Sequence, residues 1–284
     1  MKAKILDGKK IAEEILEDLK KNSPLKKVTL AIVQVGDNRV SETYIKEKQK
    51  IGTHVGVMVQ VFRFPADITQ KKLEQEVVSI GEDQEIAGLL VQLPLPKHMD
   101  MQGILDYIPI EKDVDVLSSE AFGRFTLGTS SILPPTVGAV STLLKSHKIA
   151  IKGRNVVIVG AGRLVGLPLA IWFMQERATV SVANEHTKEL SRLTRQADIL
   201  VSGVGKTGLI RGDMVKRGVV VVDAGTSVEQ SPSTKLRVNK IKGDVDFESV
   251  SKKASFITPV PGGVGPLTVA CLLRNVLTVE KTLL

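Results

Sequence analysis

The chain has 284 residues, of which 43% are hydrophobic and 25% are charged, so it is long enough for two globular domains of ordinary composition. Its single cysteine, Cys271, excludes an intramolecular disulfide and a zinc site built on several thiolates. The net charge of +8 is dispersed and aromatic residues make up only 4%, which disfavours a nucleic-acid-binding protein and is compatible with a small polyanionic ligand.

The sequence has neither the pattern of a membrane span nor that of a signal peptide. No apolar run approaches the length of a membrane span, and the N-terminal MKAKILDGKK lacks the apolar core of a signal peptide. We therefore expect a cytoplasmic protein with no membrane partner.

Helices and strands alternate in the first part of the chain. Buried-strand patterns occur at 27–35, 57–64 and 86–93, and helical patterns occur at 8–22, 39–55 and 69–81. This alternation predicts an α/β domain with a parallel sheet. Two prolines in Leu93–Pro96 end the third strand, since each removes a ladder donor.

Two helices, near 101–107 and 134–147, flank the loop 110–116 before the alternation resumes. The strands expected after them are 156–160, 179–183, 198–202, 219–223 and 255–257, and the helices are 164–175 and 187–196. A last helix, 267–277, is expected to pack on the N-terminal domain. The pattern predicts a second α/β domain that is Rossmann-like.

A glycine-rich turn follows the first strand of that second domain, in the stretch Asn155–Pro168. Gly160, Gly162 and Gly166 stand where the strand ends and the next helix begins, and positions without a Cβ let backbone N–H groups approach a pyrophosphate. The G-x-G-x-x-x-G spacing is one residue longer than the commonest fingerprint, so a turn without a ligand is the alternative.

Polar residues that could carry chemistry lie in the first domain. Tyr44 and Lys48 form a Y-x-x-x-K pattern on one helix face with Ser41, where an amphipathic helix with a solvated lysine is the alternative. Gln92 ends an apolar strand, which suggests a ligand contact. Asp113 and Asp115 alternate along a loop, so they need not act together, and the residues nearby do not suggest a metal site.

Four motifs occur in the order of a known family. These are S-x-x-Y-x-x-x-K at 41–48, VQLPLP at 91–96, KDVD at 112–115 and PGGVGPLT at 261–268. Together with ADILVSGVG at 197–205 and GDVDF at 243–247, they resemble the bifunctional methylenetetrahydrofolate dehydrogenase/methenyltetrahydrofolate cyclohydrolase family over nearly the whole chain.

The resemblance implies oxidation of 5,10-methylene-tetrahydrofolate with a nicotinamide cofactor, and hydrolysis of the methenyl product to 10-formyl-tetrahydrofolate. It implies that Lys48 acts at the one-carbon bridge, that Gln92 holds Lys48, that Tyr44 packs on the folate and that Asp115 binds the pterin. The other substrate-binding residues that it implies are Val91, Leu93, Pro261, Gly262, Gly263 and Thr268.

Departures from the family pattern concern the loop after Asp115 and the cofactor turn. Val116 replaces a common glycine, and Pro135-Thr136-Val137 replaces C-T-P. Ala161-Gly162 and Asn184-Glu185 also depart from the usual residues.

The sequence contains both an acidic and several basic residues that bear on the choice between NAD and NADP. Glu185 could bond a ribose 2′-hydroxyl and favour NAD, whereas Arg163, His186 and Lys188 could pair with the 2′-phosphate of NADP. Since most of the family uses NADP, we expect NADP, with NAD possible and no metal. The cofactor-binding residues predicted are Gly160, Ala161, Gly162, Arg163, Gly166, Glu185, Gly205, Gly225 and Thr226.

We expect residues 1–120 plus 267–284 to form a folate-binding catalytic domain and 121–266 to form the NAD(P)-binding domain, with a cleft between them. The family resemblance also implies a homodimer through the nucleotide domain. A homologue with only one activity, and a non-catalytic nucleotide-sensing Rossmann protein, are the alternative functions.

Overall fold

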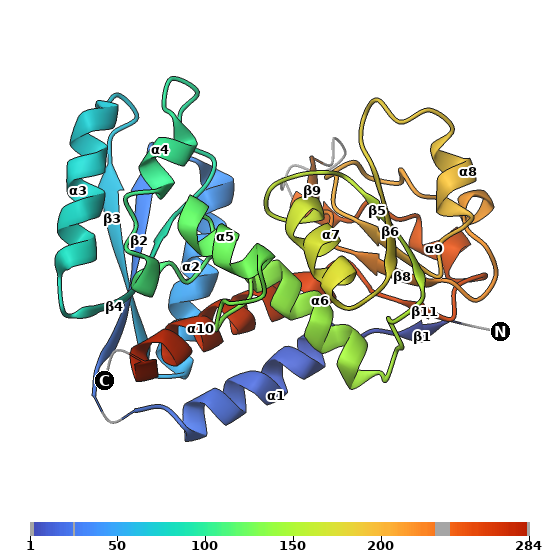
Figure 1. Ribbon diagram of the computed structural model, residues 1–284, viewed down its shortest axis with the longest axis horizontal. Helices are drawn as coiled ribbons and strands as arrows, with labels where there is room; N and C mark the ends of the chain where they lie inside the picture. Colours follow the sequence, from blue (N-terminus) through green and yellow to red (C-terminus); the bar gives the residue numbers. More distant parts are fainter. Residues whose placement is uncertain (1–2, 25, 231–238, 283–284) are drawn as a thin grey trace. The chain divides into compact units, whose positions relative to one another are not determined.

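The computed structural model describes residues 3–24, 26–230 and 239–282. It comprises two compact units, each of which contains a parallel α/β sheet (Figure 1). The described residues among 13–135 and 269–284 form one, called here the catalytic unit. Those among 1–12 and 136–268 form the other, called here the nucleotide unit. The predicted two-part α/β organisation is thus confirmed.

The catalytic unit contains a three-stranded parallel sheet with the strand order β3-β2-β4. Its strands are β2 (Val28–Val35), β3 (Val57–Phe64) and β4 (Ile86–Val91), and its main helices are α2 (Arg39–His54), α3 (Gln70–Glu82) and α4 (Met101–Leu105). All eight residues of β2 are buried, because both faces of this central strand are covered.

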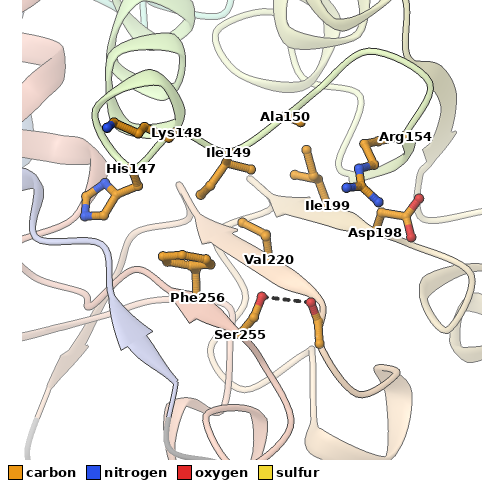
Figure 2. Close-up of a pocket in the computed structure, with 11 residues that line it drawn as sticks. His147, Lys148, Ile149, Ala150, Arg154, Asp198, Ile199, Val220, Ser255 and Phe256 are labelled. Carbon is orange, nitrogen blue, oxygen red and sulfur yellow. Dashed lines mark hydrogen bonds between the residues drawn. The ribbon is translucent and has the colours of Figure 1, made fainter.

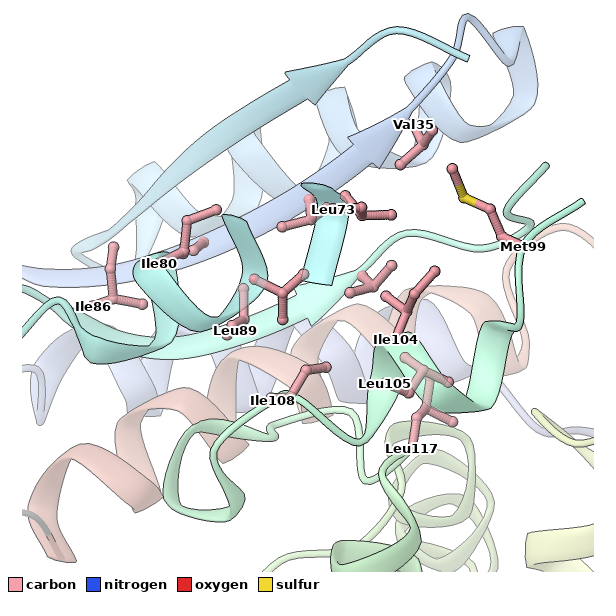
Figure 3. Packing of buried hydrophobic residues seen from close by; sticks show 14 residues of the cluster. Val35, Leu73, Ile80, Ile86, Leu89, Met99, Ile104, Leu105, Ile108 and Leu117 are labelled. Atoms are coloured by element: carbon pink, nitrogen blue, oxygen red, sulfur yellow. The ribbon is translucent and has the colours of Figure 1, made fainter. Parts of the chain in front are cut away.

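One face of this sheet packs against α3 and α4. Ala31, Val33 and Val35 of β2 join Leu73 of α3 and Leu105 of α4 in a single apolar cluster (Figure 3). Helix α2 packs against the opposite face, where a Cβ at Gly52 would lie 2.7 Å from Cγ2 of Val59. The end of helix α2 is therefore packed closely on β3.

The nucleotide unit contains a six-stranded parallel sheet with the order β1-β11-β8-β7-β5-β6. Its strands are β1 (Lys4–Ile5), β5 (Asn155–Val159), β6 (Thr179–Ala183), β7 (Ile199–Ser202), β8 (Val220–Asp223) and β11 (Phe256–Ile257). A separate hairpin pairs β9 (Ser227–Gln230) with β10 (Asn239–Lys242). Helices α6 (Pro135–Ser146), α7 (Gly166–Gln175), α8 (Leu190–Thr194) and α9 (Phe247–Val250) accompany these strands.

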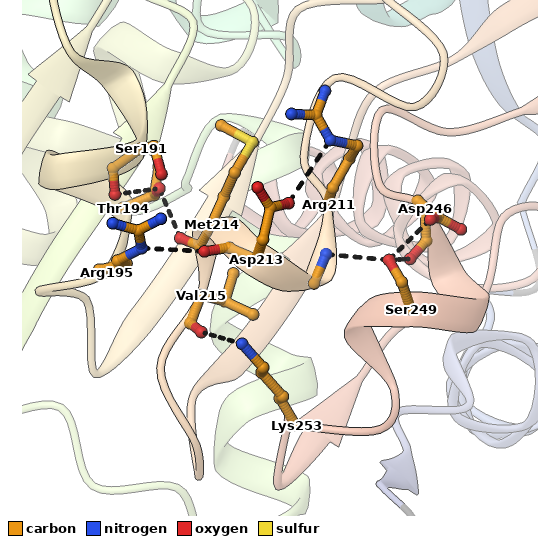
Figure 4. Close-up of polar contacts among 11 residues, drawn as sticks. Ser191, Thr194, Arg195, Arg211, Asp213, Met214, Val215, Asp246, Ser249 and Lys253 are labelled. Atoms are coloured by element: carbon orange, nitrogen blue, oxygen red, sulfur yellow. Dashed lines mark hydrogen bonds and ion pairs between the residues drawn. The ribbon is translucent and has the colours of Figure 1, made fainter.

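Side-chain bonds to backbone groups fasten the short elements of this unit (Figure 4). The Thr194 hydroxyl donates to O of Met214 at 2.7 Å, and Nε of Arg195 donates to O of Asp213 at 2.9 Å. These bonds join α8 to the short helix η2 (Gly212–Met214), and N of Gly212 donates to the Ser249 hydroxyl on α9 at 2.9 Å. Elements too short to be stable alone are thereby stabilised.

Most predicted elements are present, and the differences have local causes. The helix expected at 187–196 is only α8, because Glu189 has a φ of 52° and the Asn184 side chain accepts from N of His186 in a turn. The last helix, α10 (Val264–Thr282), is longer than expected. Strand β1, the β9–β10 hairpin and helices α5 (Ser119–Thr126) and α9 were not predicted.

The compact units divide the chain at other positions than the expected domain boundaries. Strand β1 pairs with β11, so the first residues belong to the nucleotide unit rather than to the catalytic one. Residues 121–135 belong to the catalytic unit. A two-residue strand carries too little periodic pattern to be assigned from sequence, so only its pairing reveals the assignment. None of the helices in the described part of the chain has the length and apolar character of a membrane span.

Asn275 on α10 fastens two loops of the catalytic unit. Its Nδ2 donates to O of Val114 at 2.9 Å and to O of Leu133 at 2.8 Å, and the residue is only 5% exposed. This confirms the prediction that the last helix packs on the first α/β domain, here the catalytic unit. Val114 directly precedes Asp115, so the bond also fixes the loop that carries that carboxylate.

Replacing Asn275 with alanine should lower the free energy of unfolding by about 1–3 kcal/mol, because two buried carbonyl groups lose their donor. Urea unfolding followed by circular dichroism measures this. The exposed Lys281→Ala on the same helix is the control and should change stability by less than about 0.5 kcal/mol. Equal stability of the two variants would contradict the role assigned to Asn275.

Candidate functional site

Lys48 and Gln92 form the centre of the candidate site in the catalytic unit. Nζ of Lys48 on α2 donates to Oε1 of Gln92 at 2.9 Å, just beyond the end of β4. Nε2 of Gln92 donates to O of Leu93 at 2.9 Å, so the amide presents its oxygen to the lysine. The lysine is therefore held by a fixed acceptor, and the alternative of a fully solvated lysine on this helix is not what the structure shows.

Asp115 interacts electrostatically with this lysine. Burial lowers the pKa of Lys48 below its ordinary value, and the Asp115 carboxylate opposes that shift. Burial raises the pKa of Asp115 to about 6, the lysine lowers it, and the charge of Asp113 adds to the rise. Both groups are thus shifted toward neutral pH, which suits groups that exchange protons in catalysis.

The other charged residues of the KDVD motif have structural contacts. Lys112 is buried, and its Nζ donates to O of Gly81 at 2.8 Å and to O of Asp83 at 2.7 Å, at the end of α3. Asp113 accepts from N of Leu117 at 3.0 Å and from N of Ser118 at 2.8 Å. Asp113 and Asp115 therefore have different partners, and Asp115 is the residue of this motif whose charge acts on Lys48, while Asp113 influences Asp115 only through its charge.

Val116 has a φ of 58° and is 1% exposed. This left-handed conformation is unfavourable for a β-branched residue and easy for glycine. The departure from glycine therefore leaves the left-handed turn after Asp115 in place, held by Asn275 and Asp113, at the cost of local backbone strain.

Tyr44 lies one helical turn before Lys48 and is 38% exposed, so its ring is accessible on α2. Of the remaining predicted substrate residues, Val91 is buried at the end of β4, and a cis peptide bond joins Leu93 to Pro94. The structure thus brings Tyr44, Lys48, Gln92 and Asp115 together in one unit.

Four predicted substrate residues lie in the nucleotide unit. A cis bond joins Val260 to Pro261, and Gly262 has a φ of 107°. Gly263 lies so near α1 (Gly8–Lys21) that a Cβ at Gly8 would be 1.8 Å from its O. Thr268 donates to O of Val264 within α10.

The glycine turn after β5 is closely packed against the start of α7. Gly160 has a φ of 104°, and a Cβ at Gly166 would lie 1.8 Å from O of Gly160, so the first turn of α7 sits directly on the turn. Ala161 and Gly162 are exposed, and Arg163 is partly exposed. Backbone N–H groups at an accessible helix N-terminus are what a phosphate requires.

Glu185 follows β6 and lies beyond Ala183, whose O accepts from N of Gly160 at 2.8 Å. Its side chain is 81% exposed, with Oε1 3.8 Å from Nε2 of His186. The turn at Asn184 therefore presents a carboxyl group and an imidazole side by side, so side chains from both sides of the cofactor argument lie at this turn.

The loops after β7 and β8 complete this edge of the sheet. A Cβ at Gly205 would lie 3.5 Å from O of Thr226, and a Cβ at Gly225 would lie 2.1 Å from the carboxyl carbon of Asp244. Asp223 and Asp244, both buried, were not among the predicted site residues. An aspartate at the end of an otherwise apolar strand, and another within GDVDF, were the signals available in the sequence.

A pocket of about 330 Å³ lies at the opposite edge of the same sheet (Figure 2). His147, Arg154, Asp198 and Phe256 line it, near the first residues of the strands. The predicted site residues are absent from its lining, so it is separate from the glycine turn.

Comparison with known proteins identifies close relatives. Residues 6–115 match "Tetrahydrofolate dehydrogenase/cyclohydrolase, catalytic domain", and residues 134–283 match the NAD(P)-binding domain of the same description. "Bifunctional protein FolD" of Nitratiruptor sp. is 44% identical over 283 residues, which cover 98% of each chain. The protein of the same name from Campylobacter jejuni is also 44% identical over 98% of each chain.

Two solved structures of similar sequence have closely similar folds. The crystal structure of the bifunctional FolD dehydrogenase/cyclohydrolase from Campylobacter jejuni has a TM-score of 0.93 and 43% identity, and the match covers 99% of this chain and 100% of that one. The Trypanosoma brucei enzyme, complexed with NADP and an inhibitor, has a TM-score of 0.94 and 36% identity, with 99% and 98% covered.

Gly166→Ala should lower the free energy of unfolding by about 2 kcal/mol, because its Cβ would overlap O of Gly160 and force the turn apart. Gly162→Ala is the matched control: nothing lies within 4 Å of a Cβ there. Thermal unfolding of both variants without cofactor measures the difference. A Gly166→Ala variant as stable as the control would show that the turn is not tightly packed.

The stability of the protein should depend on Asp115 in acid. Its pKa rises from 3.8 to about 6 on folding, so in that interval the folded state retains a proton that the unfolded chain has lost. The free energy of unfolding should thus fall by up to about 3 kcal/mol as pH rises from about 4 to about 7, relative to Asp115→Asn. Urea unfolding of both proteins across this range tests it, and parallel pH curves would contradict it.

Proposed function

Since the chain belongs to the tetrahydrofolate dehydrogenase/cyclohydrolase family, we propose that it oxidises 5,10-methylene-tetrahydrofolate to the 5,10-methenyl form and hydrolyses that product to 10-formyl-tetrahydrofolate. The observation that carries this proposal is the hydrogen bond between Lys48 and Gln92, with Asp115 nearby. A nucleotide sensor without turnover has no need for a partly buried lysine with a shifted pKa.

Lys48 is the proposed catalytic group at the one-carbon bridge. Hydrolysis requires that an attacking water lose a proton and that a ring nitrogen gain one, and an amine with a lowered pKa can exchange protons near neutral pH. The Gln92 oxygen holds Nζ in position. Hydride transfer needs no general base, so there Lys48 positions the substrate.

The folate contacts follow the same assignment. Tyr44 offers an accessible ring for packing against the substrate, and Asp115 offers a carboxylate that accepts hydrogen bonds from the pterin. We assign further contacts to Val91, Leu93, Pro261–Gly263 and Thr268, as the family resemblance implies, with Gly262 and Gly263 leaving the backbone open to close approach.

NADP is the proposed cofactor, and when bound it accepts the hydride from the methylene carbon. Gly160, Ala161, Gly162, Arg163 and Gly166 would hold its pyrophosphate. Glu185, Gly205, Gly225 and Thr226 line the same edge of the sheet. Two observations support NADP over NAD: Arg163 and His186 lie in or beside the two turns, and the Trypanosoma brucei relative was solved with NADP.

We also propose that the protein works in the cytoplasm as a homodimer and that its formyl product serves one-carbon metabolism, including purine synthesis. Strand β6 lies at the edge of its sheet, and Val182 on it is 44% exposed. An exposed edge strand is a natural surface for pairing with a second copy. Sedimentation of the purified protein measures its state.

Lys48→Met should reduce cyclohydrolase activity at least about a hundredfold, the usual contribution of general acid–base catalysis, and should reduce dehydrogenase activity less. Lys46→Met removes the same charge from an exposed position on the same helix and should retain both activities. The two steps are assayed separately by absorbance, with unfolding curves to confirm that both variants fold.

Cyclohydrolase activity of Lys48→Met within about tenfold of the unmodified protein would remove Lys48 from the mechanism. Loss of only one activity in the unmodified protein would instead favour the single-activity homologue. A higher kcat/KM with NAD than with NADP would overturn the cofactor assignment.

A further inference from the structure

Two buried carboxylates lie behind the loops of the nucleotide unit. Asp223 ends β8 and is 3% exposed, and Asp244 follows β10 and is fully buried. Among the described residues, neither is paired with a lysine, arginine or histidine. Buried charge without a counter-ion is unfavourable, so these carboxylates must be stabilised by hydrogen-bond donors.

Asp244 holds the loop that follows β7. Its Oδ2 accepts from the Ser202 hydroxyl at 2.8 Å and from N of Val204 at 2.7 Å, and its Oδ1 accepts from N of Lys206 at 2.7 Å. Three donors from one short segment converge on one carboxylate. The conformation of residues 202–206 is therefore set by Asp244.

Asp223 holds the loop that follows β8 and also the segment that carries Asp244. Its Oδ1 accepts from N of Gly225 at 3.0 Å and from N of Asp244 at 3.1 Å, and its Oδ2 accepts from N of Val245 at 2.8 Å. Burial, reinforced by the charge of Asp244, raises the pKa of Asp223 to about 6, while these backbone donors oppose the rise.

Close packing leaves no room for a different arrangement. A Cβ at Gly225 would lie 2.2 Å from Oδ2 of Asp244, and a Cβ at Gly243 would lie 2.1 Å from Oδ2 of Asp223. Gly225 thus packs directly on Asp244 while its own N–H donates to Asp223, and Gly243 lets the backbone pass close enough to Asp223 for the next residue, Asp244, to donate to it.

The loop held by Asp244 also contacts the glycine turn. A Cβ at Gly203 would lie 2.4 Å from Cγ1 of Val165, and one at Gly160 would lie 2.8 Å from O of Gly203. Strands β5 and β7 are neighbours whose connections run to opposite sides of the sheet order. In open α/β sheets the ligand binds at that point, beyond the carboxyl ends of the strands.

We propose that Asp223 and Asp244 are positioning residues of the cofactor site, which fix the loop 202–206 against the glycine turn and the loop 224–226 against the loop 202–206, so that a dinucleotide can enter. This inference rests on the proposed NAD(P) dependence. The carboxylates do not touch the cofactor, and act through backbone N–H groups. Neutralising either one loosens the loops and weakens dinucleotide binding.

Asp244→Asn replaces one carboxylate oxygen with an amide NH2, which cannot accept from a backbone N–H. We expect the Kd for NADP⁺, measured by isothermal titration calorimetry, to rise about ten- to a hundredfold, the loss typical of a hydrogen bond to a charged group. The KM for NADP⁺ should rise while cyclohydrolase activity, which consumes no cofactor, stays within about twofold. Asp246→Asn, two residues further on, makes the same charge change outside this network and should leave the Kd unchanged.

Should Asp244→Asn fail to fold, Ser202→Ala removes a single donor to the carboxylate and should raise the Kd in the same direction. Unchanged Kd in folded Asp244→Asn, or in folded Ser202→Ala, would overturn the proposal. An equal loss of cyclohydrolase activity would also overturn it, because it would indicate general unfolding. Failure of the unmodified protein to bind either NADP⁺ or NAD⁺ would refute the proposed cofactor itself.

Discussion

The hydrogen bond between Lys48 and Gln92 is the interaction on which the candidate site of the catalytic unit depends. A partly buried ammonium is stable only if an acceptor faces it, and the amide of Gln92 does so because its own NH2 is bound to the carbonyl of Leu93. That carbonyl lies just after β4, and Lys48 lies on α2. The geometry of the site therefore follows from how α2 packs beside the sheet.

Next to this bond, neighbouring residues of the loop 110–117 have different roles: some hold the structure and one acts on Lys48. Lys112 stabilises the end of α3, Asp113 stabilises the start of the next segment, and Asp115 is left to interact with Lys48. Val116 adopts a left-handed conformation in this loop, which is unfavourable for a β-branched residue. The hydrogen bond from Asn275 to Val114 helps to hold the loop in that conformation. Two charges with opposed pKa shifts can then coexist without forming a tight ion pair.

In the nucleotide unit, the important groups are backbone N–H groups, which are the donors that bind an anionic ligand at such turns. Small residues let the turn after β5, the start of α7 and the loop after β7 pack on one another. Buried carboxylates then orient the N–H groups behind them. At these loops, among the described residues, the packing relies on close backbone approach and on two buried carboxylates that accept from backbone N–H groups.

The sequence by itself determined the alternation of strands and helices, the two-part α/β organisation and the family, because these follow from periodicity and from ordered motifs. It also identified Tyr44, Lys48, Gln92 and Asp115 as candidates. It could not show that Asp113 is structural while Asp115 faces the lysine, since loop residues have no fixed period. Nor could it assign β1, Asp223 and Asp244, because pairing and burial between segments far apart in the chain are decided only when the tertiary structure brings them together.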